Sequence, residues 1–253
     1  MAFTIAVTGK GGTGKSTVSA CLVRILRDRD VHPIFAVDAD PNSSLAPLLG
    51  LPEGVTISDV RQEIMDAKDE VTGVAKTRVL DMKVGECIRE AKGFDMLTMG
   101  RPEGASCYCY VNNLVRHALK KLRSQYKVTL VDNEAGMEHL SRMNTDSIDC
   151  LLLVCEPTMT SARAAARIME LGDTLPVEVK RKVLVWNKVK PEGVPEQVKI
   201  PLKDLSFDAE VVLPADERVA RLSAFEESVM SSEIPEEFTM LAGACLADSS
   251  MAV

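Results

Sequence analysis

A glycine-rich segment near the start of the chain has the composition and spacing of a phosphate-binding loop. The segment reads GKGGTGKST over residues 9–17; it follows the apolar run AFTIAV and precedes a helical pattern. Glycines let backbone N–H groups close around an anion, and the N-terminus of the following helix adds partial positive charge. The spacing therefore predicts a nucleotide phosphate site formed by Gly11, Gly12, Thr13, Gly14, Lys15, Ser16 and Thr17.

Individual residues in and after this loop have predicted roles. Lys15 is expected to reach the β- and γ-phosphates, and the Ser16 hydroxyl is expected to bind Mg²⁺. Asp132 ends the later apolar run KVTLVD, a position from which an aspartate holds Mg²⁺ directly or through water. Gly136 permits a close approach and is expected to offer its backbone N–H to the γ-phosphate. Together these residues predict a site for ATP or ADP with Mg²⁺.

Two more carboxylates follow the apolar run PIFAV, in the segment Asp38-Ala39-Asp40-Pro41. Side chains two residues apart in extended backbone point to the same side, so both carboxylates are expected to face the Mg²⁺–phosphate region. Asp40 is predicted to orient the attacking water, and Asp38 to support the metal shell. The pattern is equally compatible with Asp38 only capping the following turn.

Cys107 and Cys109 form a Cys-x-Cys pair. In extended backbone both thiolates project to one side and can bind one ion, whereas a disulfide across this spacing is strained. Two thiolates under-coordinate a soft metal, but two chains facing each other across a two-fold axis supply four, which suits Zn²⁺ or Ni²⁺. The pair therefore predicts a Ni²⁺ or Zn²⁺ site at a homodimer interface; two incidental cysteines beside Tyr108 and Tyr110 are the alternative.

Alternating apolar strands and helical patterns must position these residues. Strands are expected at AFTIAV, PIFAV, FDMLTM, KVTLVD, DCLLLVCE, KVLVWNK and AEVVLP, with helices near 18–26, 57–71, 111–124 and 160–172 and from about 215. This alternation predicts an α/β fold: a mostly parallel sheet flanked by helices on both faces, in a single domain over residues 1–253. Residues 72–92 have weak periodicity and are interpreted as an insertion at the sheet edge.

The residues that end the predicted strands indicate where a ligand binds. They are polar, or they are residues typical of turns: Gly9, Asp38, Arg101, Asp132, Glu156, Asn187 and Pro214. In a parallel sheet these ends lie along one edge, where ligands bind in this architecture. Asn187 can hydrogen-bond a purine edge there, although an asparagine at a strand end is commonly a turn residue.

Composition limits the environment and the partners. The chain has 253 residues, 46% hydrophobic and 26% charged, with a net charge of −7, which argues against a nucleic-acid partner. No apolar run reaches the length of a membrane span, and no signal peptide is evident, so a cytoplasmic protein is expected. Seven cysteines do not indicate a disulfide framework in that compartment, and four of them fall in apolar patterns that predict burial: Cys21, Cys150, Cys155 and Cys245.

The loop with Lys10 at its start resembles the deviant Walker A signature of the MinD/ParA/nitrogenase-iron-protein ATPases, and the resemblance runs from residue 3 to about 220. In that family the extra lysine reaches across a nucleotide-sandwich dimer to the partner's phosphates. The resemblance therefore implies an ATPase in which Lys10, Lys15 and Asp40 are catalytic and Lys10 acts in trans, as an arginine finger does elsewhere.

Further segments match the same family. Asp38-x-Asp40-Pro41 resembles its switch I and residues 132–136 its switch II. Asn187-Lys188 resembles its adenine contact, and Pro214 with Asp216 resembles its second base-binding segment. The implied nucleotide site thus draws on five separate strand ends.

Two segments resemble a narrower group, the CooC-type accessory ATPases that mature carbon monoxide dehydrogenase: GRPEGASCYC over 100–109 and EAGMEHL over 134–140. In that group paired Cys-x-Cys motifs bind metal at the dimer interface, and ATP-driven dimerisation is linked to nickel insertion. The resemblance implies a nucleotide- and metal-dependent homodimer whose partner is apo carbon monoxide dehydrogenase or the related acetyl-CoA synthase. His139 is interpreted either as a further ligand or proton acceptor, or as a helix-start histidine bonded to backbone.

Two other functions stay open. A MinD/ParA-like positioning ATPase needs a basic amphipathic helix or basic surface, but residues 222–253 contain no Lys or Arg and carry six acidic residues. An ATP-dependent iron–sulfur electron donor takes a cluster ligand from switch II, but residues 132–140 contain no cysteine. Neither a membrane nor a nucleic acid is therefore predicted as a partner.

Overall fold

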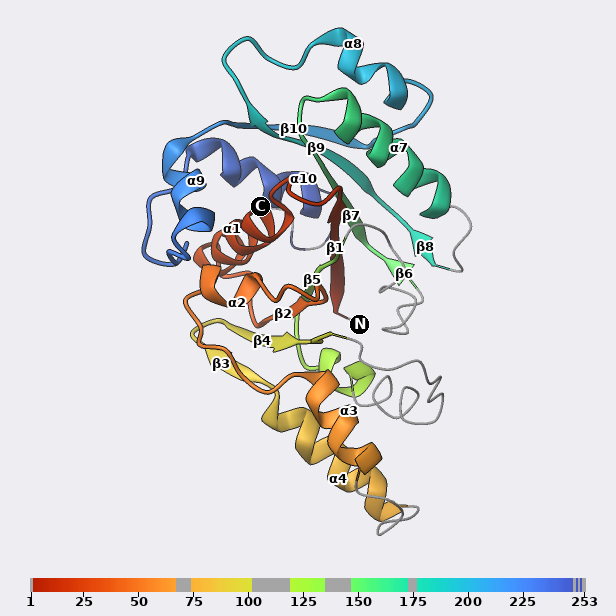
Figure 1. Cartoon of the computed structure of the whole chain (residues 1–253), viewed down its shortest axis with the longest axis vertical. Helices are drawn as coiled ribbons and strands as arrows, with labels where there is room; N and C mark the ends of the chain where they lie inside the picture. Colours follow the sequence, from red (N-terminus) through yellow and green to blue (C-terminus); the bar gives the residue numbers. More distant parts are fainter. Residues whose placement is uncertain are drawn as a thin grey trace.

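One large sheet forms the centre of the molecule (Figure 1). The computed structural model describes residues 2–66, 74–101, 119–134, 147–172, 177–247, 249 and 251, and in these residues the sheet has eight strands in the order β10-β9-β7-β1-β5-β2-β4-β3. The strands are β1 (Phe3–Gly9), β2 (Ile34–Asp38), β3 (Arg89–Ala91), β4 (Phe94–Thr98), β5 (Val128–Asp132), β7 (Cys150–Cys155), β9 (Lys182–Val189) and β10 (Ala209–Pro214). All neighbours pair in parallel except β3 and β4.

Helices cover both faces of this sheet. On one face lie α1 (Lys15–Asp28), α2 (Leu45–Leu48), α9 (Glu217–Ala224), the 3-10 helix η2 (Glu236–Thr239) and α10 (Met240–Leu246). On the other lie α3 (Ile57–Asp66), α4 (Val74–Glu86), α7 (Met159–Gly172), α8 (Glu196–Lys199) and the 3-10 helix η1 (Ile200–Leu202). A small separate ladder joins β6 (Ser147–Ile148) to β8 (Glu178–Val179). The predicted α/β fold is confirmed.

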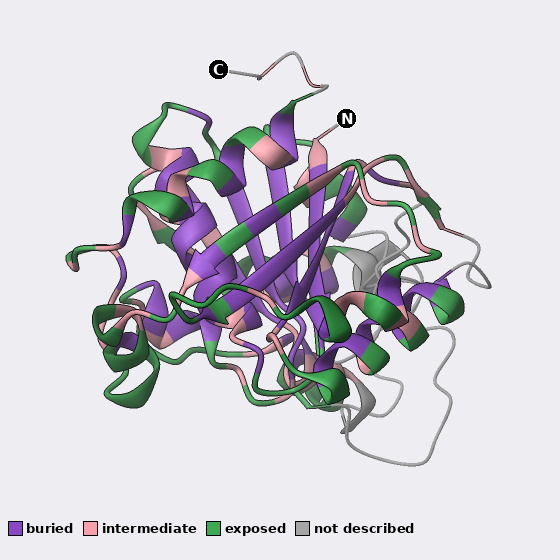
Figure 2. Cartoon of the chain, turned by 90° about the horizontal axis from the view of Figure 1, so that it is seen from above, coloured by how far each residue is buried: buried purple, intermediate pink, exposed green. Residues whose placement is uncertain are grey.

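The inner strands β1, β2, β5 and β7 are apolar along their length because both of their faces are buried (Figure 2). In β1, Ile5 and Val7 enter the core beneath α1, whereas Ala6 between them enters the core on the opposite face. This alternation follows from the two-residue period of extended backbone. Burial of both faces explains why these inner strands appear in the sequence as continuous hydrophobic runs.

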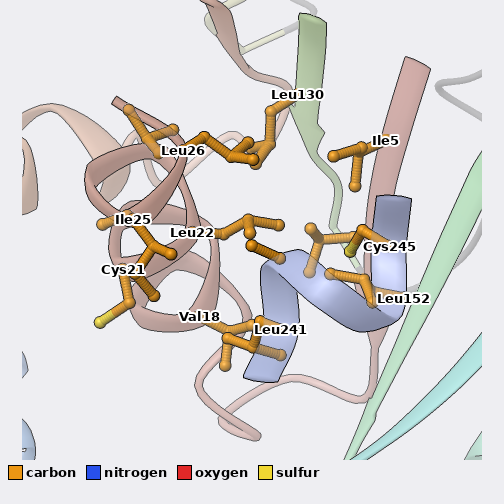
Figure 3. Close-up of a cluster of buried hydrophobic side chains, with 14 of the residues drawn as sticks. Ile5, Val18, Cys21, Leu22, Ile25, Leu26, Leu130, Leu152, Leu241 and Cys245 are labelled. Atoms are coloured by element: carbon orange, nitrogen blue, oxygen red, sulfur yellow. The ribbon is translucent and has the colours of Figure 1, made fainter. Parts of the chain in front are cut away.

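The core beneath α1 fixes the helix that carries the phosphate loop. Along α1, Val18 lies beside Leu241 of α10, Leu22 points toward Ile5 and Leu152 of the sheet, and Leu26 lies beside Leu130 of β5 (Figure 3). Each fully buried leucine contributes about 1.5–3 kcal/mol relative to an exposed one. The helix N-terminus is therefore held at the carboxyl end of β1, which is where a phosphate site requires it.

Several boundaries refine the sequence predictions. The predicted strands are all present, and the helices near 57–71 and 160–172 are found at Ile57–Asp66 and Met159–Gly172. Residues 119–123 of the helix expected at 111–124 are helical, and the rest of that helix lies outside the described residues. Within the irregular segment 72–92 the structure has α4 and the antiparallel edge strand β3, consistent with an edge insertion. The four cysteines expected to be buried are buried, and Cys87 is buried too.

Candidate nucleotide site

The sheet brings the predicted phosphate loop and the two predicted metal-shell aspartates to one edge. β1 lies between β5 and β7, so the loop after Gly9 lies between the ends of both neighbours. Asp132 at the end of β5 pairs in register with Asp38 at the end of β2. The order of strands reverses around β1 and β5, and such a switch point forms the ligand crevice in open parallel sheets.

The phosphate loop has the backbone that its glycines predict. Gly12 and Gly14 have φ of 83° and 89°, in the left-handed region that favours glycine. Gly14 begins α1 with no side-chain hydrogen bond to the first turn among the described residues. A Cβ on Gly14 would also lie 2.5 Å from Asn187 Nδ2, so only glycine fits. The first-turn N–H groups of α1 are thus left for an anion.

The two lysines of the loop lie in different environments. Lys15 is 6% exposed, and its positive charge lowers the pKa of Asp132, so it lies close to the predicted metal shell. The Lys10 side chain is exposed, and no hydrogen bond or ion pair to another described residue engages its ammonium group. An exposed lysine is suited to a contact outside its own chain. Its predicted role across a dimer stays a prediction.

The position and burial of Asp132 suit a ligand of the Mg²⁺ ion that accompanies a nucleotide bound at the phosphate loop. The side chain is fully buried; its Oδ1 accepts from Ser19 Oγ at 3.0 Å, while Oδ2 is buried and has no hydrogen-bond partner among the described residues. The Ser16 hydroxyl lies close enough to lower the pKa of this carboxyl. A buried carboxylate oxygen without a partner beside a loop serine matches the one or two protein ligands that Mg²⁺ takes alongside phosphates. Bound there, Mg²⁺ would supply positive charge to the phosphate oxygens.

Asp38 both caps the turn and lies beside Asp132, the predicted Mg²⁺ ligand. Its Oδ1 accepts from the backbone N–H of Asp40 at 3.1 Å, and its Oδ2 accepts from that of Leu45 at 3.0 Å. It also lies beside Asp132 in the sheet. The two interpretations that the sequence left open are therefore compatible. Asp40 is 8% exposed and accepts from the backbone and side chain of Asn42, both at 2.9 Å; its role with water stays a prediction.

Burial raises the pKa of both aspartates that are predicted to lie in the metal shell. Desolvation, with a smaller contribution from the charge of Asp132, raises the pKa of Asp38 from 3.8 to about 7. Desolvation raises the pKa of Asp132 to about 6, against the lowering effect of the Ser16 and Ser19 hydroxyls and of Lys15. Two carboxylates that share a buried site resist ionisation until a cation arrives. Binding of Mg²⁺–nucleotide should accordingly release protons and strengthen as pH rises through 6 to 7.

A pH dependence of stability follows. Because the pKa of Asp38 is higher in the folded state than the ordinary 3.8, proton binding favours folding; this stability is complete below about pH 4 and is lost as pH rises through about 7. The Tm of the nucleotide-free protein should fall by several degrees between about pH 5 and pH 7.5, measured by scanning calorimetry. Asp38→Asn should flatten this fall. A variant whose Tm follows the wild-type pH curve would contradict it.

Asn187 and Lys188 contact the phosphate loop in this structure. Asn187 Nδ2 donates to the Thr13 carbonyl at 2.8 Å, and Lys188 Nζ donates to the Gly12 carbonyl at 2.7 Å. Their predicted contact with adenine stays a prediction. The carboxylate of Asp216, in the second predicted base-binding segment with Pro214, caps α9 by accepting from the N–H of Arg218 at 2.8 Å. That segment's role with the base also stays a prediction.

The structure adds polar contacts that the sequence did not single out. Ser44, at the start of α2, donates to Ser16 Oγ at 2.8 Å, which links the start of α2 to the predicted Mg²⁺ ligand. Ser19, one turn into α1, donates to Asp132. Glu156, noted in the sequence only as a strand end, pairs with Lys188 at 2.6 Å. No spacing rule marks these residues, because each contact joins segments that only the fold brings together.

The remaining predicted residues lie outside the described part of the chain. These are Gly136, His139 and the Cys107/Cys109 pair. Within the described ranges, no group of three or more His, Cys, Asp or Glu side chains is arranged to hold a metal ion. None of the helices in those ranges has the length and apolar character needed to cross a membrane.

Comparison with known proteins decides the family. A model described as the CobQ/CobB/MinD/ParA nucleotide binding domain matches residues 4–229. The chain belongs to this family. An uncharacterized ATP-binding protein of Methanocaldococcus jannaschii is 37% identical over 219 residues, which cover 85% of this chain and 86% of the relative. The carbon monoxide dehydrogenase accessory protein CooC of Rhodospirillum rubrum is 35% identical over 187 residues, which cover 69% and 70%.

Solved structures of MinD/ParA proteins share the fold. The MinD cell division protein of Aquifex aeolicus superposes with a TM-score of 0.68 over 98% of both chains, at 20% sequence identity. At that identity the likeness supports the fold alone. The CobQ/CobB/MinD/ParA assignment, together with the phosphate loop and its aspartates, makes this chain an ATP-binding P-loop ATPase of the MinD/ParA type.

Proposed function

We propose that the chain is an ATP-dependent metallochaperone that helps to insert nickel into carbon monoxide dehydrogenase or the related acetyl-CoA synthase. The observation that carries the proposal is the 35% identity to a carbon monoxide dehydrogenase accessory protein, over 69% of this chain and 70% of that relative. The Cys-x-Cys pair at 107 and 109 adds the soft-metal ligands that such a role requires.

The proposed cycle couples three events. ATP with Mg²⁺ closes two chains face to face, Cys107 and Cys109 of both chains collect one Ni²⁺ or Zn²⁺ ion, and hydrolysis reopens the dimer. Each ligand that prefers the closed dimer shifts the population toward it, so nucleotide and metal should each strengthen the binding of the other. The Lys10 side chain is exposed and has no hydrogen bond or ion pair within the described part of the chain, which supports its proposed reach to the partner's phosphates.

A MinD-like positioning ATPase is the second candidate. It is favoured by the septum site-determining protein MinD of Helicobacter pylori, which is 25% identical over 92% of this chain. Against it stands the C-terminal sequence 222–253, which has acidic residues and no Lys or Arg for an anionic membrane surface or DNA. Co-sedimentation with anionic liposomes or DNA in the presence of ATP, absent without ATP, would support this candidate over nickel insertion.

Activation of a nickel-free client tests the proposal. Carbon monoxide dehydrogenase prepared without nickel should gain CO-oxidation activity faster when limiting Ni²⁺, ATP and this protein are all present. Lys15→Ala and a non-hydrolysable ATP analogue are the controls, and both should remove the gain. A parallel assay with nickel-free acetyl-CoA synthase identifies the client. Equal activation of both enzymes with and without the protein would refute a maturation role.

A further inference from the structure

The contacts of the phosphate loop extend to a residue with no assigned role. Lys188 Nζ donates both to the Gly12 carbonyl, at 2.7 Å, and to Glu156 Oε1, at 2.6 Å. Glu156 follows β7 and Lys188 lies in β9, and these strands are neighbours, with Cys155 paired to Trp186. We propose that Glu156 is a positioning residue of the nucleotide site, which holds Lys188 on the Gly12 carbonyl and so fixes the conformation of the phosphate loop.

The Gly12–Thr13 peptide is the part of the loop that this pair holds. The Gly12 carbonyl and the Thr13 N–H belong to one planar peptide group and point in opposite directions. The carbonyl accepts from Lys188, while the N–H donates to the Lys10 carbonyl at 3.3 Å. Glycine at residue 12 gives this peptide rotational freedom that a β-carbon would remove. The Lys188 contact restrains that freedom and keeps the turn closed.

The next peptide of the loop is held in a similar way. Asn187 Nδ2 donates to the Thr13 carbonyl, which directs the Gly14 N–H to the opposite side. Two adjacent residues of β9 therefore hold two successive carbonyls of the loop. Backbone N–H groups oriented before the ligand arrives bind an anion without the cost of ordering the loop.

Two features of Lys188 support this role. Its φ is 59°, a left-handed conformation that is uncommon for a residue with a long side chain and that typically persists where the surrounding structure enforces it. Its side chain is 51% exposed, so burial does not fix it, and Glu156 supplies the opposite charge that does. Glu156 is itself anchored, because its backbone N–H donates to Ser161 Oγ in the first turn of α7 at 3.0 Å.

A double-mutant cycle tests the role of Glu156. Binding of a fluorescent ATP analogue is titrated for wild type, Glu156→Ala, Lys188→Met and the double variant. Each single variant should raise Kd by about threefold to tenfold, the range for a partly exposed charge-assisted contact. The double variant should match Lys188→Met, because Glu156 acts through Lys188. Glu196→Ala removes another ion pair, to Lys199 on α8, and should leave Kd unchanged.

Lys188→Gly separates positioning from general stability. Glycine accepts the φ of 59° without strain, so the Tm of the nucleotide-free variant should stay within about 3 °C of wild type while its Kd rises as in Lys188→Met. Wild-type affinity in Glu156→Ala would overturn the proposal. So would a double variant whose loss of affinity is the full sum of the two single losses.

Discussion

Lys10→Ala is expected to bind ATP within about threefold of wild type and to lose ATP hydrolysis by roughly 10³-fold, the lower range for removal of a charge supplied in trans. The Lys10 side chain is exposed and makes no ion pair with the other described residues, so its removal should leave the fold and its own site intact. The charge that it would bring to the partner's phosphates is needed only as the transition state forms. Binding is measured with a fluorescent nucleotide and hydrolysis by phosphate release.

Lys15→Ala is the matched comparison within the same loop. Lys15 is 6% exposed and lies near Asp132, so its loss should weaken nucleotide binding itself by roughly 10²-fold. The two lysines are five residues apart, yet one variant should change the rate and the other the affinity. If Lys10→Ala hydrolysed ATP at the wild-type rate, the cross-dimer role of this lysine would be wrong.

Cys107→Ser combined with Cys109→Ser is expected to abolish tight binding of one Ni²⁺ or Zn²⁺ per two chains. Four thiolates from two chains make the proposed site, and replacing all of them by hydroxyls should weaken soft-metal binding by several orders of magnitude. Metal content after desalting and a competition titration with a chromophoric chelator give the stoichiometry and affinity. Nucleotide binding to the open monomer should be unchanged.

Cys87→Ala provides the control for loss of a thiol elsewhere. Cys87 is 1% exposed, and burial raises its pKa to about 11, so its thiol is poorly available to a metal. This variant should bind metal as the wild type does. If the Cys107/Cys109 double variant retained one tightly bound ion per two chains, the metal site would lie elsewhere in the protein. The cysteine pair would then no longer support a role in nickel insertion.

The fold could be predicted from the sequence because its strongest signals are local. The phosphate loop requires a strand before it and a helix after it, and seven apolar runs separated by helical patterns specify a parallel sheet. Asp38 and Asp132 lie 94 residues apart in the sequence, but each ends an apolar run, so a shared sheet edge was predictable. The edge strand β3 was not predictable, since a partly exposed antiparallel strand of three residues has no hydrophobic period.

The contacts that complete the site could not be predicted in the same way. Ser44 and Glu156 act on Ser16 and Lys188 through pairings that depend on how loops fold over the sheet edge. Asp216 illustrates the converse: its residue type and position suggest the base site, whereas its carboxylate is committed to the N-terminus of α9 and to Arg218. Residue type and strand position locate a site, but hydrogen-bond partners come only from the tertiary structure.

The molecular mass in solution, measured by analytical ultracentrifugation with saturating Mg²⁺, a non-hydrolysable ATP analogue and Ni²⁺ or Zn²⁺, tests the shared-site model most directly. Two chains of 27.5 kDa should sediment as one dimer that retains a single tightly bound transition-metal ion. Omission of the nucleotide or replacement of both cysteines should shift the population toward the monomer. A monomer under fully saturating conditions would contradict the model and leave an ATPase without a shared metal site.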